Sequence, residues 1–320
     1  MVEYNAPKRD YDFLLNEVLD AIPIVQNLGY SEFDRDFLSM LTDGWAEHVK
    51  EVWLPINQLG DREGLKFNNG EIKMPEEFKI AYKESVDAGW LSTSCKPEHG
   101  GMGVPIFFQT VIWAEFGTSA NMALSVLPAL SLGVYEVLAE HGEKELVDYF
   151  ATNMASGKWS GTMCLTEPHA GTDLGMITTK AVPQEDGTYL VTGTKIFITY
   201  GEHDMTENIV HLVLAKTPDA PEGTRGISLF LVPKYLPSEW KSEGLSGVSE
   251  ELNTQHNGVT CSGSEEKMGV HASPTCVMNF EQSRGWRVGD LYNGMPLMFE
   301  MMNRELSLIH ISEPTRRRGI

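Results

Sequence analysis

The sequence is poor in basic residues. Its 320 residues include 25 Lys and Arg against 45 Asp and Glu, which gives a net charge of −20. Nucleic-acid phosphates bind to clustered Lys and Arg, and anionic membrane surfaces attract basic segments. The charge balance therefore argues against both partners, and a polyanionic ligand would need local basic side chains.

Cysteines are also few, at Cys95, Cys164, Cys261 and Cys276. None of them forms a C-x-x-C pair, so the sequence indicates neither a zinc site nor a redox dithiol. The histidines show no ligand spacing either, and we expect no metal. Reduced cysteines are typical of a cytoplasmic protein, which is the localisation that we expect.

Long apolar segments are a third absence. The first ten residues contain no apolar signal segment. We identify no uncharged apolar run that approaches the ~20 residues of a membrane span, and we expect no membrane partner. Hydrophobic residues make up 42% of the chain, which is ordinary for a globular protein with a substantial core.

The pattern of apolar residues changes along the chain. Residues 1–155 are predicted to be helical, because residues typical of caps, first turns and helix ends, such as Pro75 and Gly89, separate amphipathic runs. Residues 156–285 contain short β-branched runs and turns, and they predict an antiparallel β-domain in which 238–266 is a long excursion. Helical character returns at 286–305. Helices followed by strands, without βαβ alternation, favour an α+β fold.

The most informative segment is 164–175, which follows a predicted strand. It places the hydroxyls of Thr166 and Thr172 at the two ends of a turn that contains Gly171 and Gly175. Glycines let the backbone approach a flat ligand, and hydroxyl and N–H donors suit the polar edge of an oxidised flavin. The segment resembles the signature of the acyl-CoA dehydrogenase family, except that Met176 stands where the family expects a small residue.

A second segment, 192–201, supports the same resemblance. Its period-two alternation predicts a strand with Phe197 and Thr199 on one face. An aromatic ring beside a hydroxyl can cover a flavin and hydrogen-bond to it. The family usually carries Trp-Ile-Thr at this place, and this chain carries Phe-Ile-Thr, so the ring is smaller and lacks the indole N–H.

The resemblance covers roughly residues 3–305 and implies a three-part architecture. An N-terminal helical domain occupies 1–155, a middle antiparallel β-domain occupies 156–285, and a C-terminal helical bundle starts at 286–305. Residues 306–316 resemble a translated sequencing adapter. We therefore expect 306–320 to be a non-native tail and the chain to be truncated.

The resemblance also implies FAD as the cofactor and an acyl-CoA as the substrate. The positions that match FAD-binding residues of the family are Met163, Leu165, Thr166, Phe197, Ile198 and Thr199. The positions that match substrate-binding residues are Thr172, Arg304, Asn121, Leu124 and Ser125. For the last three, ordinary helix packing is an equally good interpretation, and the match at Arg304 is weakened by a family Asp that is Met301 here.

No catalytic residue is assigned, because the family's base lies in the C-terminal helical domain. Glu167 is a carboxylate inside the ligand loop and could act as a base. The better interpretation is that Glu167 and Asp173 hold the turn by accepting hydrogen bonds from its backbone N–H groups.

The activity implied by the resemblance is α,β-dehydrogenation of an acyl-CoA thioester to a trans-2-enoyl-CoA. An electron-transfer flavoprotein would accept the electrons, and the parent protein would be a homo-oligomer. Residues 4–10 and 256–276 resemble the 3-methylmercaptopropionyl-CoA dehydrogenase subgroup. An acyl-CoA oxidase and a catalytically silent flavin- or acyl-CoA-binding module remain open alternatives. We expect the 320-residue chain alone to be inactive, because it lacks the family's base.

Overall fold

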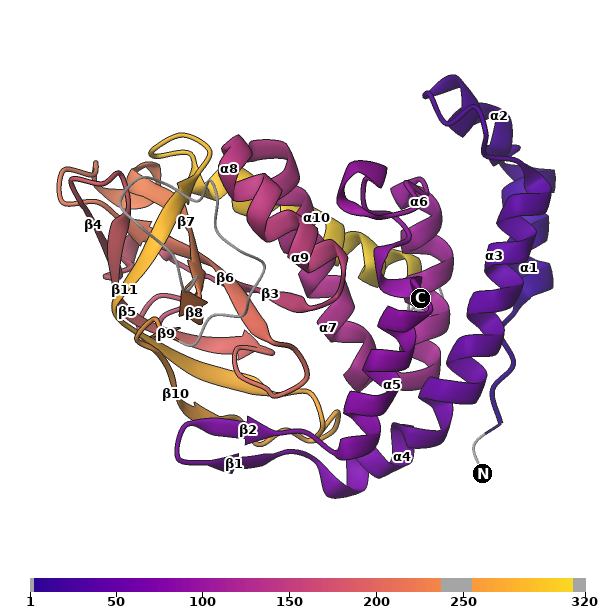
Figure 1. Ribbon diagram of the computed structural model, residues 1–320, viewed down its shortest axis with the longest axis horizontal. Coiled ribbons are helices and arrows are strands. Elements are labelled where there is room, and N and C mark those ends of the chain that lie inside the picture. Colours follow the sequence, from indigo (N-terminus) through magenta and orange to yellow (C-terminus); the bar gives the residue numbers. More distant parts are fainter. Residues whose placement is uncertain (1–2, 237–254, 313–320) are drawn as a thin grey trace, which may run out of the picture.

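The computed structural model describes residues 3–236 and 255–312, and side chains up to residue 303. Figure 1 shows helices packed on one side of a twisted sheet, with a long central helix, α7, between the sheet and the outer helices. The last helix, α10 (Gly294–Ser312), lies along α7. This arrangement agrees with the predicted order of a helical domain, a β-domain and the start of a further helical part.

Helices form most of the N-terminal half, and sequence signals explain several of their ends. The side chain of Asp34 caps α3 by accepting the amide of Phe37 at 2.8 Å. Helix α5 begins directly after Pro75, and Gly89 follows it at positive φ. The helices are α1 (Lys8–Asp12), α2 (Ala21–Asn27), α3 (Arg35–His48), α4 (Leu54–Glu63), α5 (Glu76–Asp87), α6 (Ile106–Phe108), α7 (Ala114–His141), α8 (Lys144–Leu146) and α9 (Thr152–Ala155).

One part of the half predicted as helical is a β-hairpin. Strands β1 (Lys66–Asn68) and β2 (Glu71–Lys73) pair antiparallel across Asn69 and Gly70, which both have positive φ. Three-residue strands are too short to show alternation, so the prediction of continuous helix is wrong here. The Asn-Gly dipeptide was the available signal, because a tight hairpin turn requires positive φ at both central residues.

The middle of the chain forms a seven-stranded sheet with the order β10-β11-β5-β4-β6-β3, and β7 pairs with both β11 and β6. A short pair, β8 with β9, lies outside this sheet. The predicted turn at 185–188 joins β4 to β5. The strands are β3 (Trp159–Cys164), β4 (Lys180–Pro183), β5 (Tyr189–Thr199), β6 (Asn208–Lys216), β7 (Ile227–Pro233), β8 (Tyr235–Leu236), β9 (Gln255–His256), β10 (Val259–Ser264) and β11 (Thr275–Val288).

Two details of the sheet correct the prediction of an antiparallel domain with a long excursion. Strand β6 runs parallel to β3, so the sheet is mixed. The intervening β4–β5 hairpin supplies the long connection that a parallel pair needs. The predicted excursion contains β9 and β10, and its residues 238–254 lie outside the described residues. A bulge between Cys261 and Gly263 disturbs the alternation of β10 and explains why the strand was missed.

Helix α7 is the centre of the hydrophobic core. Its Leu124, Leu127 and Leu138 are fully buried, and it packs against β3 and α10. The helical stretch Ile106–His141 is long and apolar enough to span a membrane by length and composition, so the expectation that no such run exists is wrong. Within its most apolar window, 67% of the residues are buried inside the protein, which is the pattern of a core helix.

Candidate functional site

The loop that follows β3 is hydrogen-bonded to the end of β5. The amide of Ile196 donates to the carbonyl of Thr166 at 2.9 Å, and Lys195 Nζ donates to the carbonyl of Leu165 at 2.9 Å. The two segments that the sequence places around a flavin therefore lie side by side, although they are separate in the sequence.

Two threonine hydroxyls at this junction are open to a ligand. Thr166 and Thr199 are half-buried, and neither hydroxyl bonds to another residue in the part of the chain that the structure describes. Partly buried hydroxyls in folded proteins are normally bonded to protein or to water. A ligand with acceptor atoms along one edge could therefore bind to both without displacing a protein contact.

Phe197 follows Ile196, whose amide is bonded to Thr166, and it has an unusual backbone conformation. Its φ is 60°, and the pairing of β5 with β11 contains a bulge opposite it, between Cys276 and Met278. The bulge interrupts the regular alternation that the sequence predicts and leaves the Phe197 side chain 57% exposed. Positive φ at a non-glycine residue is strained and is often found at functional sites.

The other predicted cofactor residues contribute mainly backbone. Met163 is half-buried at the end of β3, whereas Leu165 and Ile198 are in the core. A ligand could meet Leu165 and Ile198 only through their backbone groups. The carbonyl of Leu165 is already bonded to Lys195, which sequence reasoning did not identify.

Thr172 and Asp173 are on the exposed part of the loop. The side chain of Asp173 accepts the amide of Gly175 at 3.0 Å, as expected for a residue that holds the turn. Thr172 has no hydrogen bond to another described residue and is accessible to a substrate.

Glu167 is buried and accepts five hydrogen bonds. Its donors are the amide and hydroxyl of Thr178 at 2.7 and 2.9 Å, the amide and hydroxyl of Thr179 at 3.0 and 2.5 Å, and Lys195 Nζ at 2.9 Å. Burial opposes ionisation, but the charge of Lys195 and the threonine donors outweigh it and lower the pKa of Glu167 to about 2. A carboxylate held in this way is a poor proton acceptor, which supports the structural interpretation of Glu167. Its threonine partners lie 11 and 12 residues downstream and Lys195 lies 28 residues downstream, rather than in its own turn.

Four tryptophans on the helical side surround an apolar cavity of about 320 Å³. Trp45 comes from α3, and the other three come from the short helical segments Val49–Trp53, Trp90–Ser92 and Gln109–Trp113. The residues that line it include Trp45, Trp53, Trp90, Trp113, Met122, Ser125, Pro128, Ala129 and Leu132.

Of the three predicted acyl-pocket residues, only Ser125 lines this cavity. Asn121 is fully buried, donates to the carbonyl of Trp53 at 3.1 Å and accepts the amide of Leu124 at 3.0 Å. Its φ of −156° interrupts the helical backbone of α7, so its side chain satisfies groups that the interruption frees. These contacts of Asn121 and the burial of Leu124 agree with the alternative interpretation of helix packing, and their match to substrate-binding residues stays a prediction.

Two further predictions concern the end of the chain. Arg304 belongs to α10, but its side chain lies outside the described residues. The proposed tail, 306–320, is described only as backbone up to Ser312. In the described part of α10, Met298 and Met301 are buried, which agrees with a Met-rich core face.

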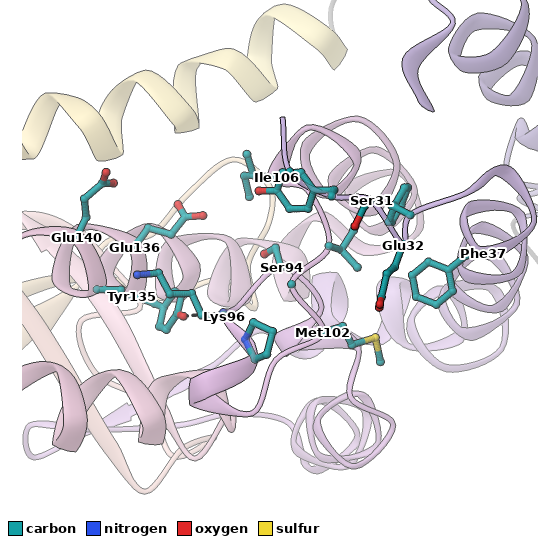
Figure 2. A pocket seen from close by; sticks show the side chains of 17 residues that line it. Ser31, Glu32, Phe37, Ser94, Lys96, Met102, Ile106, Tyr135, Glu136 and Glu140 are labelled. Atoms are coloured by element: carbon teal, nitrogen blue, oxygen red, sulfur yellow. Dashed lines mark hydrogen bonds between the residues drawn. The ribbon is translucent and has the colours of Figure 1, made fainter. Parts of the chain in front are cut away.

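A larger cleft than the tryptophan cavity lies elsewhere. It measures about 830 Å³ and opens between the α2–α3 connection, the loop before α6 and the end of α7. Figure 2 shows Tyr135, Glu136 and Glu140 of α7 along one side and Glu32 and Phe37 on the other. None of the described candidate site residues lines it, so its size alone does not make it the functional site.

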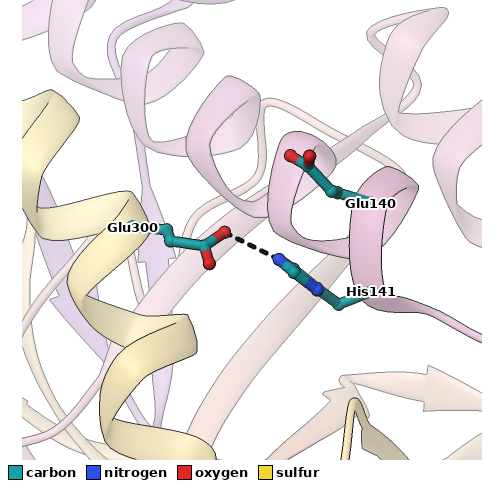
Figure 3. A group of neighbouring side chains, drawn as sticks. All are labelled: Glu140, His141 and Glu300. Carbon is teal, nitrogen blue, oxygen red and sulfur yellow. Dashed lines mark hydrogen bonds and ion pairs between the residues drawn. The ribbon is translucent and has the colours of Figure 1, made fainter.

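A cluster of three potential metal ligands joins α7 to α10. Side-chain ligand atoms of Glu140, His141 and Glu300 lie within 4.8 Å of one another, and His141 Nε2 is 2.7 Å from Glu300 Oε2 (Figure 3). Our search of histidine spacing did not reveal this group, because Glu300 is 159 residues from His141. The histidine–carboxylate bond by itself accounts for the arrangement and ties the two helices together.

Comparison with known families agrees with the fold and the loop. Residues 39–158 match the acyl-CoA dehydrogenase N-terminal domain, and residues 162–283 match the acyl-CoA dehydrogenase middle domain. The chain belongs to the acyl-CoA dehydrogenase family, as the resemblance of its motifs predicts.

Individual relatives share about half their length with this chain. It is 44% identical over 300 residues to a 3-methylmercaptopropionyl-CoA dehydrogenase of Ruegeria pomeroyi, covering 93% of this chain and 49% of that protein. It is 35% identical over 310 residues to a butyryl-CoA dehydrogenase of Syntrophomonas wolfei, with the same coverage of 93% and 49%. A solved acyl-CoA dehydrogenase from Bacillus anthracis, complexed with FAD, has the same fold, with a TM-score of 0.68 at 20% identity over 88% of this chain and 42% of that one.

Proposed function

We propose that this chain carries the FAD- and acyl-CoA-binding part of a dehydrogenase that converts an acyl-CoA thioester to its trans-2-enoyl-CoA. The observation that carries the proposal is the junction of the β3 loop with β5. The two segments that meet there carry the hydroxyls of Thr166 and Thr199, which have no partner among the described residues, and the exposed ring of Phe197. FAD bound at this junction would supply the acceptor for the hydride that leaves the β-carbon.

The residues present fit a flavin. The hydroxyls of Thr166 and Thr199 would donate to acceptor atoms on the polar edge of the ring system. The exposed face of Phe197 would cover the ring, and backbone groups of Met163 and Ile198 would line it. Exclusion of water by these groups strengthens each hydrogen bond that they make.

The tryptophan cavity supports a short acyl group as substrate. Its volume of about 320 Å³ is at the lower end of the range for small-ligand sites, about 300–1,000 Å³. Sulfur makes favourable contacts with aromatic rings, so this lining suits a methylthio group as well as a short alkyl chain. We therefore propose 3-methylmercaptopropionyl-CoA as the first substrate to test and butyryl-CoA as the second. Thr172, on the exposed loop, would face the CoA arm.

Removal of the α-proton requires a base, and Glu167 does not suit this role because five donors occupy it. The family resemblance places the base in the C-terminal helical domain. By the same resemblance, an electron-transfer flavoprotein would accept the electrons and the whole protein would be a homo-oligomer. Four free, buried cysteines support a reducing compartment such as the cytoplasm.

The proposal is tested by titrating the 320-residue chain with FAD and following flavin absorbance and fluorescence. We expect saturable binding with a perturbed flavin spectrum. Anaerobic addition of 3-methylmercaptopropionyl-CoA should then perturb the spectrum further without turnover, because the base is supplied elsewhere. A folded chain that leaves the spectrum of FAD unchanged would contradict the proposal. Full turnover by this chain would contradict the assignment of the base.

A further inference from the structure

A lysine and a glutamate are buried together behind the proposed flavin loop. The side chains of Lys195 and Glu167 are 0% and 1% exposed, and Lys195 Nζ is 2.9 Å from Glu167 Oε1. Removal of two charges from water is costly, and a buried ion pair is often no more stabilising than apolar residues of similar size. A gain in stability is therefore a weak explanation for this pair.

The bonds of Lys195 point to a different role. Its ammonium group also donates to the carbonyl of Leu165, and the next residue, Ile196, donates its amide to the carbonyl of Thr166. Two consecutive carbonyls of the loop are thus fixed to two consecutive residues of β5. The hydroxyl of Thr166 is attached to the backbone that these two bonds hold.

Glu167 fixes the other end of the same loop. Its carboxylate bonds to the amides and hydroxyls of Thr178 and Thr179, and the carbonyl of Thr179 accepts the amide of Lys216 from β6. The loop is therefore anchored to β5 at its start and, through Thr179, to β6 at its end, with one ion pair between the anchors.

We propose that Lys195 and Glu167 are positioning residues that set the Thr166 hydroxyl against Phe197 and Thr199 for FAD binding. This inference rests on the proposed function. Neither residue needs to touch FAD, because both act through the backbone of the loop. Removal of either should displace Thr166 and weaken FAD binding even where the chain remains folded.

The chain contains a matched control in a second Lys–Glu pair. Lys234 Nζ is 2.7 Å from Glu202 Oε1, and the two side chains are 13% and 5% exposed. This pair has the same chemistry and belongs to the same part of the chain. It has no bond to the loop after β3 among the described residues.

The experiment compares two sets of variants of the 320-residue chain. The test set is Lys195→Met, Glu167→Gln and the double variant, and the control set is Lys234→Met, Glu202→Gln and their double variant. For each folded variant, the urea unfolding midpoint, the Kd for FAD and the bound flavin spectrum are measured. Amide hydrogen exchange is measured without FAD at Ile196 and at Ala170, whose amide donates to the carbonyl of Glu167 at 3.0 Å.

We expect the test single variants to weaken FAD binding about 10-fold or more, since a charge-assisted bond that orders the site is lost. The control variants should lower the unfolding midpoint but leave the Kd unchanged. The decisive result concerns the test double variant. Its unfolding midpoint should return towards that of the unaltered chain, because no unpaired charge remains. Its FAD affinity should stay low, because the carbonyl of Leu165 still lacks its donor.

Recovery of FAD affinity together with stability would overturn the inference, as would equal losses in the control set. If the unaltered chain binds no FAD, the proposed function fails, and hydrogen exchange still tests the anchors. If the amides of Ile196 and Ala170 exchange faster in Lys195→Met than in Lys234→Met, the proposed anchoring of the loop is supported. Equal exchange in the two variants overturns it.

Discussion

The sheet side and the helical side of the molecule are built by opposite means. On the sheet side, a buried ion pair, a bulge and a residue at positive φ occur in the loop that carries Thr166 and in the end of β5 that carries Thr199. On the helical side, four tryptophans and α7 enclose an apolar cavity with few polar groups. Directional hydrogen bonds require donors fixed in position, whereas an apolar group requires only a space of suitable shape. Substitutions on the two sides should therefore affect different ligands.

The largest effect that we predict is on the sheet side. Glu167→Ala leaves Lys195 buried beside a single carbonyl, and it should lower the free energy of unfolding by about 3–5 kcal/mol. Lys195→Met should cost less, because Glu167 keeps its four threonine donors. Urea denaturation of both variants measures the difference. As a control, Asp173→Ala removes one exposed hydrogen bond and should have a small effect on the free energy of unfolding. A larger loss in Lys195→Met than in Glu167→Ala would show that Lys195 is the dominant anchor.

The second prediction concerns the helical side. Ala129→Leu narrows the tryptophan cavity and should weaken binding of 3-methylmercaptopropionyl-CoA by about 1–3 kcal/mol, the typical cost of overpacking. FAD affinity should not change. Isothermal titration with each ligand measures both. Ala139→Leu is the matched control, since Ala139 is also a half-buried residue of α7 but lines the cleft of Figure 2. Equal losses in both variants would mean that the tryptophan cavity does not hold the acyl group.

The third prediction concerns how stability depends on pH through buried histidines of the sheet part and the helical part. Burial lowers the pKa of His203 and His211 in the sheet part to about 3 and that of His48 in the helical part to about 4, from an ordinary 6.5. The unfolded chain therefore binds more protons than the folded chain below pH 6.5. As the pH is lowered, each histidine decreases the free energy of unfolding by at most about 1.4 kcal/mol per pH unit.

Glu167 titrates in a separate window. Because its folded pKa is about 2, its stabilising contribution is complete above an ordinary value near 4.5 and is lost as the pH falls towards 2. Urea denaturation between pH 7 and 5 should show the histidine slope without the contribution of Glu167. His211→Gln should reduce that slope, and an unchanged slope would mean that His211 is not held neutral.

The smallest effect is that of a single hydroxyl. Thr166→Val should weaken FAD binding by about 0.5–1.5 kcal/mol, the value of an ordinary hydrogen bond. Flavin fluorescence titration measures the Kd. Thr172→Val should leave FAD binding unchanged and weaken acyl-CoA binding instead. If Thr166→Val has no effect on FAD affinity, then Thr166 does not contact the flavin.

Local patterns in the sequence were sufficient for the main elements of the sheet side. The turn at 185–188, the strand before the loop and the position of Thr166 follow from short-range signals of hairpins and loops. Two other features were not predicted from such signals. The hairpin at Asn69–Gly70 has three-residue strands, which show no period, and the parallel pairing of β6 depends on partners elsewhere in the sequence.

The sequence by itself determined the family, the order of the helical and β parts, and the two segments that meet at the proposed flavin site. Tertiary structure decided how these segments are held. Lys195 meets Glu167 across 28 residues, and four tryptophans from separate helices and turns close one cavity. Short-range patterns record backbone preference and burial, whereas contacts between distant residues exist only after the chain has folded.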